Sequence, residues 1–118
     1  MESRILANVE PAEVFHYFED LTRIPRESGN EAAVCAYLVD FAKAHNLQYQ
    51  TDDAHNIIMR KPAGKGCEGK PGVILQAHMD MVCEKNAGVQ HDFAKDPISF
   101  TVDGDEVIAK ETTVGADD

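Results

Sequence analysis

His78 and Asp80 are the first residues of this chain whose types and spacing suggest chemistry. They close an apolar run, residues 73–77, with an imidazole and a carboxylate two positions apart. Histidine nitrogen and carboxylate oxygen are ligands that zinc accepts readily when no cysteine is used. The pattern therefore predicts that His78 is a metal ligand.

Asp80 is predicted to orient this ligand. Side chains two positions apart on a strand point to the same face, so Asp80 can accept a hydrogen bond from the second ring nitrogen of His78. Such a partner fixes the tautomer of a ligating histidine and raises its basicity. Alone, the His-x-Asp pattern also fits a strand end with a surface ion pair, and only its surroundings can separate the two interpretations.

The apolar run that carries the pair predicts a buried strand. It is reached from Pro71 and Gly72 and is typical of strands covered on both faces in the sheet of an α/β domain. In such sheets, ligands collect at the carboxyl ends of the strands, where the following loop leaves room for a substrate. His78 stands at that end.

Two helices are predicted ahead of this strand. Apolar residues recur at helical spacing over residues 14–21, and the proline that follows Ile24 ends the helix. A second helix carries the apolar stripe of residues 34–45. Residues 28–31 have the form of a capping box at its start, with Asn30 as an alternative cap.

Shorter alternating segments predict two hairpins. Residues 47–50 and 56–60 should pair with each other, and residues 98–102 should pair with residues 106–109 across an Asp-Gly turn. Together with the helices and the buried strand, these segments predict an α/β fold with two N-terminal helices and a mixed β-sheet.

The charge balance excludes several classes of partner. The chain has 118 residues, of which 21 are acidic and 11 basic, and its formal net charge of −10 repels phosphate backbones and anionic lipids. No segment approaches the roughly 18 apolar residues of a membrane span, and no apolar leader segment follows the N-terminus. We expect a cytoplasmic protein that binds neither nucleic acid nor membrane, with reduced thiols at Cys35, Cys67 and Cys83.

The other histidines are predicted to take no part in the chemistry. His16 and His45 fall on the helices as structural residues. His55 and His91 lie in turn or loop sequence, from which His91 could approach the strand end. Cys83 lacks the paired histidine of a recognisable nucleophile arrangement, so packing is its expected role.

Three strings around these residues carry a resemblance to a known family. They are residues 24–31 (IPRESGNE), residues 76–86 (QAHMDMVCEKN) and residues 114–118 (VGADD). In this order they resemble the zinc-dependent aminoacyl-histidine dipeptidases, the Xaa-His dipeptidase or peptidase D family. The likeness extends over essentially the whole chain.

The resemblance implies two zinc ions in a phosphorylase/hydrolase-like α/β catalytic domain that hydrolyses dipeptides such as carnosine-like Xaa-His. His78 falls on the family's first metal-binding histidine, and Asp80 falls on the aspartate that orients it. Asp117 falls on the aspartate that bridges both metals, and Asp118 stands where asparagine is frequent. A bridging carboxylate can give one oxygen to each ion and hold the pair about 3.5–4 Å apart.

Members of that family are several times longer than this chain. Residues 1–118 are therefore expected to be the N-terminal part of one catalytic domain, cut inside the GAD motif, with no second domain. The general base and the remaining ligands would follow Asp118, so the chain alone should bind zinc weakly and leave dipeptides intact. Apolar faces normally covered by later sequence would favour self-association into a homo-oligomer.

Two alternatives stay open at this point. The first keeps the metal chemistry but changes the substrate, as in a related zinc aminopeptidase or amidohydrolase. The second is a noncatalytic fragment or interaction module, because two ligands without a base complete neither a tight zinc site nor a catalyst.

Overall fold

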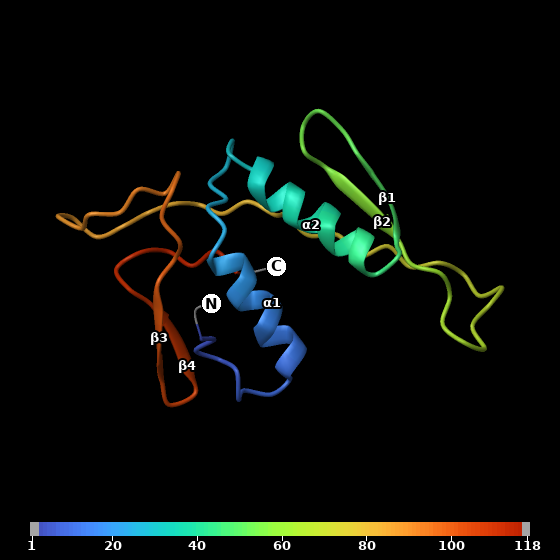
Figure 1. The fold of residues 1–118 in the computed structure, drawn as a ribbon, viewed down its shortest axis with the longest axis horizontal. Coiled ribbons are helices and arrows are strands. Elements are labelled where there is room, and N and C mark those ends of the chain that lie inside the picture. The colour runs from blue at the N-terminus through green and yellow to red at the C-terminus, as the bar shows by residue number, and fades with distance from the viewer. Residues whose placement is uncertain (1–2, 117–118) are drawn as a thin grey trace.

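The computed structural model describes residues 3–116, which form two helices and two antiparallel hairpins (Figure 1). In chain order the elements are α1 (Ala12–Thr22), α2 (Ala32–Ala44), β1 (Gln48–Thr51), β2 (Ile57–Arg60), β3 (Phe100–Asp103) and β4 (Glu106–Ala109). Both helices and both hairpins were predicted from local patterns, and all four are confirmed. No helix of this described range has the length and apolar content that crossing a membrane requires.

The helix pair lies between the two hairpins (Figure 1). The rings of Tyr17 and Phe41 meet edge to face at 5.4 Å and join α1 to α2. The rings of Phe18 and Phe100 meet at 5.7 Å and attach β3 to α1. A backbone hydrogen bond of 2.8 Å from the amide of Ile98 to the carbonyl of Thr22 also joins the segment before β3 to the end of α1. The second hairpin is thereby fixed to the C-terminal end of α1.

The predicted mixed sheet does not form within residues 3–116. Strand β1 pairs only with β2 there, with Gln48 opposite Arg60, and β3 pairs with β4, with Phe100 opposite Ala109. Residues 73–77 pair with no strand of the described chain. A strand is stable only where neighbouring strands satisfy its backbone groups, and these residues have no such neighbours in the described range.

The predicted burial of that run is also wrong for this chain. The side chains of Val73, Ile74 and Leu75 are 84%, 92% and 93% exposed. An apolar run predicts a buried strand only when other layers of the fold lie over it. Within the described residues, the buried apolar side chains are instead Leu6, Val34, Cys35, Ala42, Met81, Ile98 and Phe100.

The capping box predicted for α2 is absent as well. Glu31 occupies the N-cap position, and no side chain of the described residues caps the first turn. The Ser28 hydroxyl donates instead to the carboxylate of Asp80, while Glu31 accepts a hydrogen bond from the amide of Gly29. A hydroxyl bonds more strongly to an ionised carboxylate than to a neutral backbone group, so the long-range partner prevails.

Two adjacent carboxylates on α1 anchor the N-terminal segment. Glu19 is 2% exposed and accepts the backbone amides of Ile5 and Leu6. Asp20 accepts hydrogen bonds from Arg4 at 2.5 Å and from the Tyr37 hydroxyl at 2.8 Å. Partial burial acts to raise the pKa of Asp20, but these two bonds outweigh it and hold the pKa below 3.8.

Asp20 should therefore stabilise the fold at neutral pH and lose this effect in acid. Because its pKa is lower in the folded state, its contribution is present above the unfolded-state pKa, near 3.8, and disappears as the pH falls through the folded value. Asp20→Asn should lower the free energy of unfolding by about 1 kcal/mol at pH 7 and by less in stronger acid, as measured by urea denaturation. A difference that does not depend on pH would contradict this role.

The exposed run should be insensitive to polar substitution. Leu75→Ser should change the free energy of unfolding by less than about 0.5 kcal/mol, because its side chain is already in water. Leu6→Ala is the matched control from the core and should cost about 2–5 kcal/mol. Urea denaturation measures both, and a loss at Leu75 as large as that at Leu6 would show that the run is buried in solution.

Candidate metal-binding site

Three segments that are distant in the sequence meet next to α1. Residues 26–28, 79–81 and 114–115 form this meeting point, which we call the junction. The amide of Met81 donates to the carbonyl of Arg26 at 2.9 Å, and the amide of Ser28 donates to the carbonyl of Met81 at 3.3 Å. These two bonds make a parallel bridge between Glu27 and Met81, which ties the His78 segment to the loop between the helices.

A chain of polar contacts leads from this junction to His78. The Ser28 hydroxyl donates to Oδ2 of Asp80 at 2.5 Å, and Oδ1 of Asp80 lies 3.0 Å from Nδ1 of His78. The hydrogen bond from Ser28 holds the pKa of Asp80 below its usual value; partial burial opposes this effect and the contact with His78 reinforces it. Asp80 is therefore ionised at neutral pH and suited to accept the Nδ1 proton of His78.

The sequence did not reveal the part that Ser28 plays. Its spacing from Glu31 predicted a helix cap, and its actual partner lies 52 positions away. No periodic pattern relates residues at that separation. The only signal that could have indicated it is the occurrence of Ser28 in one of the three family-like strings, with Asp80 in another.

Gly115 brings the third segment into contact with the second. Its φ is +57°, and a Cβ atom at this position would lie 2.3 Å from the Cβ of Met81. The residues that precede Asp117 thus pass directly over the residues that follow His78. Asp117, the predicted bridging ligand, and Asp118 lie outside the described residues.

A cavity of about 820 Å³ adjoins the junction. Its walls come from α1, α2, the turn before β2, residues 76–80 and residues 115–116. The ionisable side chains among the lining residues are those of Tyr17, Arg26, Glu31, His55, His78 and Asp80. The cavity therefore combines apolar helix surface with acid, base and cationic groups.

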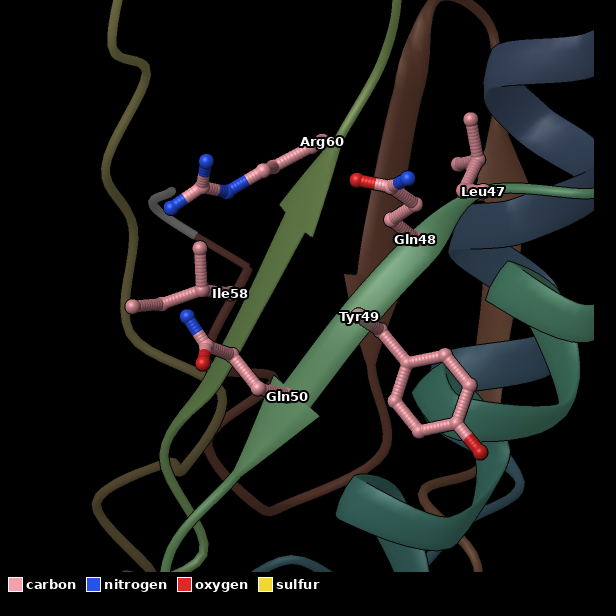
Figure 2. A pocket seen from close by; sticks show the side chains of 6 residues that line it. All are labelled: Leu47, Gln48, Tyr49, Gln50, Ile58 and Arg60. Carbon is pink, nitrogen blue, oxygen red and sulfur yellow. The ribbon is translucent and has the colours of Figure 1, made fainter.

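A second hollow of about 460 Å³ lies on the β1–β2 hairpin and has a different character (Figure 2). Gln48, Gln50, Ile58 and Arg60 stand on one face of the hairpin, whereas Tyr49 points from the other face. Its six lining residues include no histidine, cysteine or carboxylate. Proton transfer and metal binding are therefore better served by the cavity beside His78.

Comparisons with known proteins show which proteins share this sequence and fold. No protein-family profile matches the chain. The cytosol non-specific dipeptidase of Escherichia coli (strain K12) is 41% identical over 112 residues, a match that covers 95% of this chain and 23% of that protein. The crystal structure of aminoacylhistidine dipeptidase from Vibrio alginolyticus superposes with a TM-score of 0.90 at 41% identity, again over 95% of this chain and 23% of the other. This chain is homologous to part of these dipeptidases.

The dipeptidase homology confirms the resemblance inferred from the three strings. The chain spans about a quarter of the length of these relatives. A more distant match, 23% identical over 117 residues, is to a protein from Aspergillus niger that is named as a carboxypeptidase. That match covers 92% of this chain and 28% of the relative.

The remaining histidines of the dipeptidase-like chain lie in varied surroundings. His16 has Nε2 3.6 Å from Asp20, and His45 stacks on Phe41 at 4.1 Å. His55 lines the cavity and has a φ of +64°. His91 packs against Phe93 at 4.5 Å. Within residues 3–116, no three histidine, cysteine or acidic side chains are grouped closely enough to hold one metal ion.

Gly115→Ala should disrupt the approach of the third segment to the second. The added methyl group would collide with Met81, and its backbone conformation is disfavoured for alanine. We expect a loss of about 2–4 kcal/mol in the free energy of unfolding, from overpacking together with the left-handed backbone.

Gly104→Ala is the matched control for this substitution. Gly104 has a similar φ of +63° but open space around the position of a Cβ, so only the backbone term of about 1 kcal/mol remains. Chemical denaturation compares the two variants. Equal losses would show that Gly115 does not approach Met81 closely in solution.

Proposed function

We propose that this chain forms part of a zinc-dependent dipeptidase that hydrolyses Xaa-His dipeptides, with His78 and Asp117 as metal ligands and Asp80 as the residue that orients His78. The observation that carries the proposal is the Ser28–Asp80–His78 series of contacts. The junction connects these three residues to the segment that leads into Asp117. The homology to dipeptidases supplies the reaction class.

The donor set fits a zinc ion. With Nδ1 of His78 next to the ionised Asp80, Nε2 is the ring nitrogen that would coordinate metal. Asp117 would be the ligand shared by both zinc ions, as the family resemblance implies. Zinc held there would supply a Lewis acid for a peptide carbonyl and an activated water near neutral pH.

The chain's own residues prepare this chemistry. Asp80 stabilises one tautomer of His78, and Ser28 prevents the Asp80 carboxylate from rotating away. The cavity of about 820 Å³ lies within the range of roughly 300–1,000 Å³ that small-molecule sites occupy. We infer that a dipeptide enters there, and that the protein acts in the cytosol, as the name of its relative states for that protein.

A related zinc peptidase or amidohydrolase with another substrate remains a second enzyme candidate. The named activities of the relatives, dipeptidase and carboxypeptidase, both concern peptide bonds but differ in the substrate that they describe. The relatives' names therefore agree on cleavage of a peptide bond, and the preference for a histidine-containing substrate is the more specific part of the proposal.

Zinc titrated into the chain should bind weakly but saturably, because only two of the usual three or four protein ligands are assigned to it. Isothermal titration calorimetry measures this binding. His78→Ala should abolish it, and Asp80→Asn should weaken it about 10–100-fold through loss of the orienting partner. His16→Ala is the control, since that histidine does not line the cavity.

Two results would contradict the proposal. Binding that is absent in the parent chain would favour a noncatalytic interaction module instead. Robust metal-dependent cleavage of an Xaa-His dipeptide by the 118-residue chain would show that the chain holds a complete site and not a part of one.

A further inference from the structure

Arg26 is a buried cation at the centre of the junction. It is 5% exposed and lies in the loop between the two helices. Among the described residues, its guanidinium donates to five backbone carbonyl oxygens in three separate parts of the chain, those of Leu21, Met79, Asp80, Val114 and Gly115. Such a position costs desolvation energy, so the arginine is retained there only because many acceptors surround it.

The two ends of the guanidinium serve different segments. Nη1 donates to the carbonyls of Met79 and Asp80, both at 3.4 Å. Nη2 donates to the carbonyls of Val114 at 3.2 Å and Gly115 at 2.8 Å. The shorter pair is the stronger, so Arg26 holds residues 114–115 more firmly than residues 79–80. Nε donates to the carbonyl of Leu21, at the end of α1, at 3.4 Å.

Only an arginine can make this set of contacts. Its planar fork presents donors in fixed, divergent directions, so one side chain can bond to two segments at once. A lysine in its place has three donors on one nitrogen and cannot reproduce five contacts that diverge from three nitrogens. The two segments are also joined directly by hydrogen bonds of Thr113 to Val82 and Glu84, so the specific effect of Arg26 falls on residues 114–115, where Gly115 passes over Met81.

We propose that Arg26 is a positioning residue that fixes the spacing between the His78 segment and the segment that carries Asp117. We call the hydrogen bonds from Arg26 to residues 79–80 and 114–115 the clamp. The clamp follows from the contacts above, whereas its consequence for metal binding rests on the proposed function. Arg26 acts on the two segments through their backbone carbonyls.

The first test is metal-free and uses the parent chain. Nitrogen-15 NMR of the arginine side chains should show separate, slowly exchanging Nη1 and Nη2 signals for Arg26, because rotation about the Cζ–Nη bonds requires breaking contacts on both sides. A single averaged signal would overturn the clamp. This measurement does not depend on whether any variant folds.

The second test is hydrogen exchange of Arg26→Lys, with Arg23→Lys as the matched control. Arg23 lies three positions earlier and is 36% exposed, with a single 3.5 Å ion pair to Glu19. We expect exchange at Met81 and over residues 111–116 to rise at least tenfold in Arg26→Lys, with α2 unchanged and the control equal to the parent. Unchanged exchange would overturn the clamp, and uniform acceleration that includes α2 would reduce Arg26 to a general stabilising residue.

The third test separates positioning from stability. Titration with Co²⁺, followed by its visible absorption, should show at least tenfold weaker binding in Arg26→Lys, with an altered spectrum, and parent-like binding in Arg23→Lys. Parent-like binding in Arg26→Lys would overturn the positioning role. If the parent chain binds no Co²⁺, the proposed function fails, while the NMR and exchange results still decide whether the clamp exists.

Discussion

The junction depends on one buried positive charge surrounded by carbonyl oxygens. Arg26 connects the end of α1 to two segments that are more than thirty positions apart in the sequence. A guanidinium gains more from several acceptors than a neutral donor would, and burial strengthens each contact. The candidate site is therefore organised by a polar interaction, while the aromatic contacts around α1 hold the hairpin and the helices.

Among residues 3–116, the backbone contacts that anchor the His78 segment lie on its C-terminal side. Leu75 is 93% exposed, whereas Met81, six positions later, is 3% exposed. The change occurs where backbone bonds to Arg26 and Ser28 begin. His78 and Asp80 lie on this boundary, between the exposed residues 73–75 and the buried Met81. In the proposed function, this boundary gives His78 a fixed support through Asp80 and the junction.

Local sequence patterns predicted the helices and hairpins because their determinants are local. The apolar stripe of residues 34–45 and the Asp-Gly turn after β3 each act within a few residues, and both gave the observed element. The same local reasoning failed for Ser28 and for residues 73–77. A capping motif competes with any stronger partner that the fold supplies, and an apolar run is buried only if another layer covers it.

The sequence by itself determined the local elements, the presence of a histidine and a carboxylate two positions apart, and the kinship with dipeptidases. Only the tertiary structure decided that Ser28 bonds to Asp80, that Gly115 passes over Met81, and that Arg26 joins both segments. These contacts span up to 89 positions of sequence. They follow from how the whole chain packs, and no pattern confined to a few neighbouring residues encodes them.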